Sequence, residues 1–241
     1  MISVISAVTS GFGYVTAVLL IVPTGAGLIA LYRICDRSRR FNPMLRAVCA
    51  ALPAVFGVFA RVKGAQNLPR ESAPILLSNH VNLFDAFILR GYLPPSLTFC
   101  GMELESHFSW PVYGLLMRIF GNIPVPHGCP TAARRSIKRA VTVATTKNTG
   151  VLIFPEGHRT RTGTIQPFMS GPFRVARLSG MPVVPVVMDR AFQRKRVTHL
   201  RVTPGLVTIH IAPPIAPELV AHTPLPRLKE ELRQRMAALM R

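Results

Sequence analysis

A histidine and an aspartate separated by four residues form the part of this 241-residue chain best suited to chemistry. They are His80 and Asp85, in the run 78–85 (SNHVNLFD). An imidazole titrates near neutral pH, and a carboxylate bonded to one ring nitrogen leaves the other nitrogen free to accept a proton. Such a pair can activate a hydroxyl group. The alternative is a loop histidine next to a helix-capping aspartate.

Apolar runs on both sides of this motif predict the elements that position it. Residues 74–77 (PILL) indicate a short buried strand, and residues 83–92 suit a helix that begins near Asn82 or Asp85. Side chains five residues apart do not share a helix face. We therefore expect His80 on the loop after the strand and Asp85 in the first helical turn, with the loop folding back to join them.

A second polar cluster follows another apolar run, in residues 151–163 (VLIFPEGHRTRTG). In an α/β domain, loops at the carboxyl ends of strands form the ligand crevice. The planar guanidinium groups of Arg159 and Arg161 could hold a phosphate. Glu156 could position these arginines or accept a hydrogen bond from a hydroxyl group. The alternative is a solvated turn with a Glu–Arg ion pair.

Together, these motifs resemble the glycerolipid acyltransferase family, which includes the bacterial 1-acylglycerol-3-phosphate acyltransferases. Four blocks of that family match in order between about residues 62 and 214. The blocks are Asn79-His80 with Asp85, the run 121–127 (GNIPVPH), the run 154–159 (FPEGHR) and the strand 183–187 (VVPVV). The joint order of the first and third blocks is more specific than either block alone.

The resemblance implies that His80 is the general base for an acceptor hydroxyl and that Asp85 orients it. The alkoxide would attack an acyl thioester carried by coenzyme A or an acyl carrier protein, without a metal, a cofactor or an acyl-enzyme. The leading acceptor is a lysophospholipid, 1-acylglycerol-3-phosphate, which would become phosphatidic acid. The candidate substrate-binding residues are Asn79, His127, Glu156, Gly157, Arg159 and Arg161.

Two departures from the family pattern leave the acceptor open. His127 ends the second block where relatives usually have an arginine, and residues 168–171 (FMSG) lack two basic residues that often follow the third block. Arg161, Arg174 or Arg177 would have to compensate. The alternatives are a different lyso-lipid acceptor, such as a lyso-ornithine lipid, or a non-catalytic basic membrane-binding protein with this fold.

The composition indicates an anionic membrane surface as a partner. The chain has 29 Lys plus Arg and 10 Asp plus Glu, a formal net charge of +19, and 49% hydrophobic residues. A protein both so basic and so apolar suits an anionic leaflet. The sequence predicts no nucleic-acid partner, because it carries no zinc-finger, basic-zipper or aromatic-basic strand signature.

An apolar amino terminus strengthens the membrane prediction. Residues 2–32 carry no formal charge, residues 12–31 could cross a bilayer core, and four arginines follow within residues 33–40. This pattern places the protein at the membrane, with its catalytic domain on the cytoplasmic face. A segment that enters one leaflet is the alternative, with residues 43–60 as the second helix found in relatives.

We therefore expect membrane-associated helices in residues 1–60 and an acyltransferase α/β domain in residues 61–241, in which helices flank a mixed sheet. Further strands are predicted at 97–101, 122–125, 151–154, 183–187 and 206–211, and further helices at 111–120, 131–147 and 226–241. The four cysteines have no paired spacing, so we expect neither a disulfide framework nor a metal site.

Two basic stretches have no assigned role at this point. The predicted helix 131–147 carries a cluster of four basic side chains, which is most simply a solvated face but could attract lipid headgroups or the phosphates of a thioester carrier. Residues 190–201 predict a basic loop, either solvated or facing a membrane.

Overall fold

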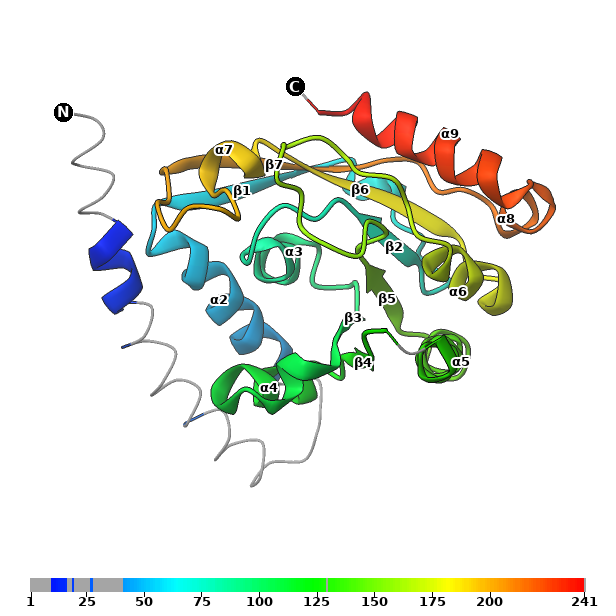
Figure 1. Cartoon of the computed structure of the whole chain (residues 1–241), viewed down its shortest axis with the longest axis horizontal. Helices are drawn as coiled ribbons and strands as arrows, with labels where there is room; N and C mark the ends of the chain where they lie inside the picture. Colours follow the sequence, from blue (N-terminus) through cyan, green and yellow to red (C-terminus); the bar gives the residue numbers. More distant parts are fainter. Residues whose placement is uncertain (1–9, 17–18, 20–26, 28–40, 129, 241) are drawn as a thin grey trace.

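The computed structural model describes residues 10–16, 19, 27, 41–128 and 130–240. Seven strands in these residues form one sheet in the order β1-β7-β6-β2-β5-β3-β4 (Figure 1). The strands are β1 (Val58–Lys63), β2 (Ile75–Ser78), β3 (Phe99–Leu104), β4 (Ile123–Val125), β5 (Gly150–Ile153), β6 (Val183–Asp189) and β7 (Gly205–Ile211). All neighbouring strands are parallel except β6 and β7, so the predicted mixed sheet is confirmed.

Helices cover both faces of this sheet. The α-helices are α2 (Phe41–Ala54), α3 (Asp85–Tyr92), α4 (Pro111–Ile119), α5 (Pro130–Lys147), α6 (Gly171–Ser179), α7 (Ala191–Arg194), α8 (Pro217–His222) and α9 (Leu225–Ala237). Two short 3₁₀ helices are η1 (Ala65–Asn67) and η2 (Glu105–Ser109). Side chains of α5, α6, α8 and α9 share a core cluster on one face, and those of α2, α3 and α7 share a cluster on the other.

The central strands β2, β5 and β6 are buried along their whole length. Leu76 of β2 belongs to the cluster under α3, whereas its neighbours Ile75 and Leu77 belong to the cluster under α5 and α6. Burial of one such side chain contributes about 1.5–3 kcal/mol to folding. Because β2, β5, β3 and β4 run parallel, the loops after their carboxyl ends meet at one edge of the sheet.

The region 43–60, expected as one helix, instead divides between two elements. Helix α2 ends at Ala54 and strand β1 begins at Val58. Gly57 makes the turn with φ of 70°, and a Cβ atom there would lie 2.9 Å from the Pro204 side chain. Strand β1 then satisfies its backbone by pairing with β7. The division of the chain at residue 60 stays a prediction.

The predicted membrane segment lies largely outside the described residues. Residues 10–16 are helical, and Tyr14 of this helix donates a hydrogen bond to the carbonyl of Leu200 at 2.7 Å. The Tyr14 ring packs edge-on against Phe56, with 4.9 Å between the ring centroids. No helix within the described ranges is long and apolar enough to cross a bilayer.

Arg90 of α3 lies enclosed between two rings and two thiols. Its guanidinium carbon is 4.6 Å from the Phe99 ring centroid and 4.1 Å from that of Phe120. Burial lowers the pKa of Arg90 to about 10, and it raises the pKa of Cys49 to about 12 and that of Cys100 to about 11. The two thiols therefore stay protonated at physiological pH.

We predict that neither Cys49 nor Cys100 reacts with iodoacetamide in the folded protein at pH 8. Only the thiolate is nucleophilic, and both pKa values lie well above 8. Peptide mass spectrometry after labelling measures this, and the same protein in urea, where both thiols are exposed, is the control. Labelling of either residue in the folded state at the rate of a free thiol would contradict the prediction.

Candidate active site

His80 and Asp85 meet at the carboxyl edge of the sheet, where His80 follows β2 and Asp85 begins α3. Nδ1 of His80 lies 2.8 Å from Oδ2 of Asp85, so the loop folds back as the sequence predicts. The Asp85 side chain is fully buried, and that of His80 is 23% exposed. Because an ionised carboxylate only accepts hydrogen bonds, Nδ1 carries the proton and Nε2 is left able to accept one.

The same carboxylate oxygen also shapes the loop. Oδ2 of Asp85 accepts hydrogen bonds from the backbone N–H of Val81 at 2.5 Å and of Asn82 at 2.9 Å. Oδ1 is buried and has no hydrogen-bond partner among the described residues. Asp85 therefore orients the imidazole and binds the loop that precedes α3. It is not the helix cap that the sequence left as the alternative, because α3 begins without a side-chain capping hydrogen bond and both backbone donors lie in the loop before it.

Glu156 connects the third block to the first. Its Oε1 accepts the backbone N–H of His80 and its Oε2 accepts that of Gln166, each at 2.7 Å. The side chain is 1% exposed. Burial raises the pKa of Glu156, while the two N–H donors lower it. Glu156 is thus a clamp that joins the backbone of His80 to that of Gln166. None of the ion pairs in the described residues joins Glu156 to an arginine, as the solvated-turn alternative would require.

The imidazole ring of His80 is held on a further side by Phe154. The two rings stack with 4.0 Å between centroids and 13° between planes. The carbonyl of His80 accepts a hydrogen bond from the Thr160 N–H at 2.8 Å. Backbone and ring contacts from the 154–160 segment therefore fix both the position and the plane of the imidazole.

The two asparagines of the first block use their amides inside the fold. Asn79 is buried, accepts the N–H of Met188 at 2.8 Å and donates to the carbonyl of the same residue at 3.4 Å. Asn82 donates to the carbonyls of Ala191 and Lys195, both at 3.2 Å. Asn79 therefore ties β2 to β6 in this structure, and Asn82 ties the histidine loop to α7.

Gly157 permits a close approach of the 168–171 segment. Its φ is 74°, and a Cβ atom on it would lie 2.3 Å from the Met169 sulfur. Met169 N–H donates to the Pro155 carbonyl at 2.7 Å, and its side chain is 58% exposed. Where relatives often have a basic residue, this chain therefore places a thioether against the glycine of the third block.

The candidate phosphate ligands Arg159 and Arg161 are exposed on the loop after β5, and His127 is exposed after β4. Arg161, Arg174 and Arg177 were proposed to replace the missing basic residues of the family pattern. Of these three, Arg177 already makes hydrogen bonds within the protein. It donates to the carbonyl of Val220 at 3.0 Å and to that of Thr223, so it holds α8. Arg159 and Arg161 remain the exposed arginines on the same loop as Glu156.

Lys195 is a cation of the site region that the sequence did not single out. It is 4% exposed, and its ammonium group donates to the carbonyls of Arg196 and His199. Burial lowers the pKa of Lys195, and the positive charge of Arg159 lowers it further. The two cations are thus close enough to interact. A lysine in a basic stretch offers no sequence signal for such burial.

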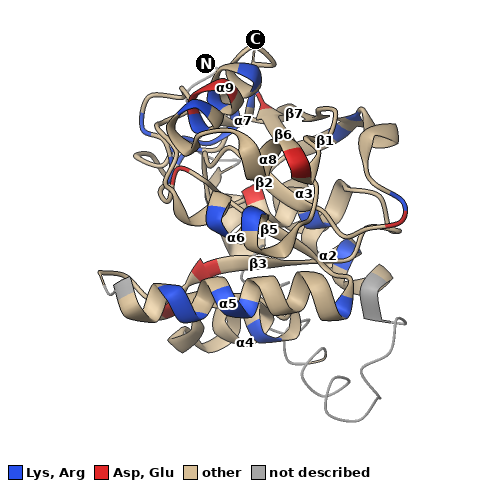
Figure 2. Ribbon diagram, turned by 90° about the vertical axis from the view of Figure 1, so that its right-hand side faces the viewer, with Lys and Arg blue, Asp and Glu red and all other residues tan. Residues whose placement is uncertain are grey.

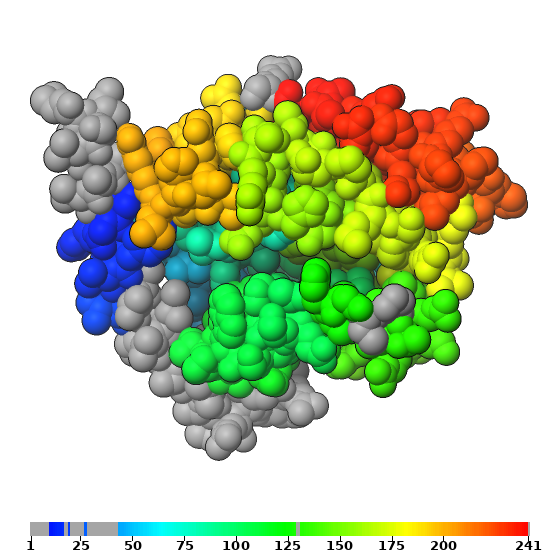
Figure 3. Space-filling model, viewed as in Figure 1, coloured from blue at the N-terminus to red at the C-terminus, as the bar shows by residue number. Residues whose placement is uncertain are grey.

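A pocket lies beside Phe154, the residue whose ring stacks on His80. Its walls are mainly apolar, including Phe87, Phe99 and Met102, together with Arg90 and Glu103. Figure 3 shows the front of the molecule hollowed between the yellow-green loop after β5 and the green η2 and α4.

Another polar cluster was also missed, because its members occur in no recognised motif. The carboxylate of Glu103 lies 2.5 Å from His107 Nδ1 and accepts a hydrogen bond from the Tyr113 hydroxyl at 3.4 Å. Burial, and then Glu103, raise the pKa of Tyr113. Glu103 also lines the pocket, so this hydrogen-bonded cluster places an acidic side chain on the pocket wall.

Comparison with known proteins identifies the family of this chain. The sequence model of the family described as Acyltransferase matches residues 59–189, more than half of the chain. The chain therefore belongs to the acyltransferase family. Acyl transfer in this family needs an acyl donor and no cofactor, and the described residues contain no group of three metal-ligating side chains.

Curated relatives carry a more specific name. The 1-acyl-sn-glycerol-3-phosphate acyltransferase of Limnanthes douglasii is 30% identical over 161 residues, which are 67% of this chain and 56% of the plant protein. The alpha enzyme of that name from Homo sapiens is 25% identical over 199 residues, covering 82% of this chain and 69% of the human protein. The chain thus spans little more than half the length of the plant relative.

A solved structure shows the same fold. The crystal structure of the 1-acyl-sn-glycerophosphate (LPA) acyltransferase PlsC from Thermotoga maritima matches with a TM-score of 0.83 and 19% sequence identity. The match covers 99% of this chain and 95% of that chain.

We predict that Glu156→Gln lowers the free energy of unfolding by about 1–3 kcal/mol. One carboxylate oxygen becomes an NH₂ group that faces a backbone donor, which leaves a buried donor unsatisfied. Urea unfolding measures the loss, and amide exchange should accelerate at His80 and Gln166. Glu231→Gln is the control, because that carboxylate pairs with the exposed Arg227. Equal losses in both variants would contradict the clamp.

Proposed function

We propose that this protein is a membrane-associated O-acyltransferase that moves a fatty acyl group from a thioester to the free hydroxyl of a lysophospholipid. The observation that carries the proposal is the 2.8 Å contact between His80 and Asp85, which leaves Nε2 of a partly exposed imidazole as a base. The names of the curated relatives make 1-acyl-sn-glycerol-3-phosphate the leading acceptor, with phosphatidic acid as the product.

In the proposed reaction, Nε2 of His80 removes the proton of the acceptor hydroxyl as its oxygen attacks the thioester carbonyl carbon. Asp85 offsets the positive charge that forms on the imidazole. The carbon–sulfur bond then breaks, the ester is released, and the leaving sulfur takes the proton from His80. The ring returns to its neutral form without a covalent enzyme intermediate.

The surroundings of His80 support these substrates. The mainly apolar side chains beside Phe154 offer a surface that suits contact with part of an acyl chain. The exposed Arg159 and Arg161 suit the negative charge of a phosphorylated acceptor. The buried Lys195 lies close enough to Arg159 to add to the positive charge there. Met169 and His127 favour the second candidate, a different lyso-lipid, because they put no permanent charge where relatives have cations.

Exposed apolar side chains support contact with the membrane, and the arginines within residues 33–40 support its cytoplasmic face. Phe12 and Val15 on the amino-terminal helix are 73% and 59% exposed, and Leu200 is 79% exposed. The hydrogen bond from Tyr14 to Leu200 holds these two segments together. An apolar surface in so basic a protein suits insertion into an anionic leaflet.

We predict that His80→Ala lowers kcat for acyl transfer by roughly 10²–10⁴-fold, the usual contribution of a general base. The protein should stay folded and keep its vesicle binding, because the backbone N–H groups of Val81 and Asn82 still bind the buried Asp85 carboxylate. Chromatography of product from a labelled acyl donor measures the rate, with His222→Ala on α8 as the control. Full turnover in the His80 variant would remove the proposed base.

We also predict that Arg159→Ala raises the KM for 1-acylglycerol-3-phosphate by roughly tenfold or more, as expected for a lost charge-assisted hydrogen bond. The KM for a lyso-lipid without a phosphomonoester should change little. Arg235→Ala on α9 provides a matched loss of one exposed arginine. If both acceptors respond equally, Arg159 does not recognise the phosphate.

A further inference from the structure

The outer face of α5 carries a basic patch that the chain does not neutralise. Its members, which we call the α5 basic face, are Arg134, Arg135, Lys138 and Arg139, and all four are exposed. Helix α5 contains no acidic residue, and none of the ion pairs found in the described residues involves these four side chains. Figure 2 shows blue segments along α5 and no red on it.

This patch is unfavourable for the helix itself. Arg134 and Lys138 are four residues apart, as are Arg135 and Arg139, and like charges at this spacing repel each other. The opposite side of α5 holds the helix in place through the buried Ala140 and Ala144. The basic side chains are therefore not needed for packing, which points to an anionic partner outside the chain.

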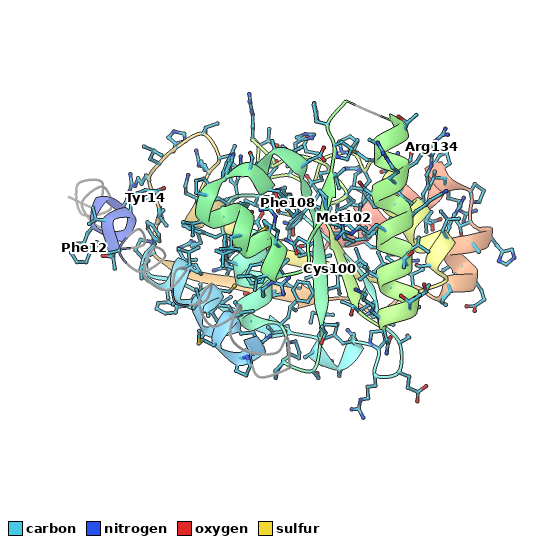
Figure 4. The ribbon with its side chains drawn as sticks, turned by 90° about the horizontal axis from the view of Figure 1, so that it is seen from below. Phe12, Tyr14, Cys100, Met102, Phe108 and Arg134 are labelled. Atoms are coloured by element: carbon cyan, nitrogen blue, oxygen red, sulfur yellow. The ribbon has the colours of Figure 1, made fainter. Side chains whose placement is uncertain are left out.

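The α5 basic face begins near the active site. Strand β4 ends at Val125 on the edge of the sheet where His80 lies, and α5 starts at Pro130 after a short connection. Figure 4 places Arg134 at the opposite end of the molecule from Phe12 and Tyr14. The basic face is thus distant from the apolar helix that we assign to the membrane.

We propose that the α5 basic face docks an acidic acyl carrier protein, which delivers the acyl thioester to His80. This inference rests on the proposed function and specifies its donor. Carrier proteins of this kind present acidic helices and hold the acyl group on a flexible arm, so docking beside the active-site edge would let the thioester reach the pocket. The four cations within residues 134–139 complement such a surface, steer its approach and fix its orientation.

The test compares two donors that carry the same acyl group, acyl carrier protein and coenzyme A, with one acceptor. The variant R134E/K138E should lower kcat/KM for the acyl carrier protein at least tenfold and leave that for acyl-coenzyme A within twofold. Added salt should reduce the wild-type rate with the carrier and affect the variant less. The control K147E/R235E has the same change in net charge, away from the active-site edge, and should match the wild type.

The remaining outcomes are distinguishable. Equal losses with both donors, or loss of binding to anionic vesicles in R134E/K138E, would overturn carrier docking and assign the face to the membrane or the acceptor. Unchanged kinetics with both donors, or a wild-type protein that uses only acyl-coenzyme A, would also overturn it while leaving the acyltransferase function intact. Failure of the wild type with both donors would overturn the proposed function and, with it, this inference.

Discussion

Three N–H donors converge on one buried oxygen, Oδ2 of Asp85, and the geometry of the site depends on that convergence. A buried carboxylate without donors is costly, so the loop before α3 must wrap around it. Two of the donors are backbone groups that set the path of this loop. The third is the His80 ring, so the same bonds that stabilise the buried charge also orient the imidazole.

The sheet makes this arrangement possible from residues far apart in the chain. Parallel strands β2 and β5 bring the histidine loop and the 154–160 segment to one edge. Glu156 then binds the His80 backbone, and Phe154 stacks on its ring. The imidazole is thus held by a neighbouring loop at backbone and ring, which is what preorganisation of a base requires.

The predictable parts of the fold were those with strong local patterns. The apolar runs predicted β2, β5 and β6, and the predicted helices 111–120 and 131–147 match α4 and α5 within a few residues. Strand β1 was missed because residues 58–63 lie next to a helical pattern and acquire their strand partner, β7, from the far end of the chain. Such a pairing is decided by packing and leaves little trace in local propensity.

The sequence by itself determined the chemical groups of the site: a histidine and an aspartate at the right spacing, a glutamate and arginines in a glycine loop, and a large positive charge. Only the tertiary structure decided what each group binds. Glu156 became a clamp, Asn79 a tie to Met188, Arg177 a support for α8, and Lys195 a buried neighbour of Arg159. These partners are distant along the chain, and only packing of the sheet and its helices brings them within hydrogen-bond or Coulomb range.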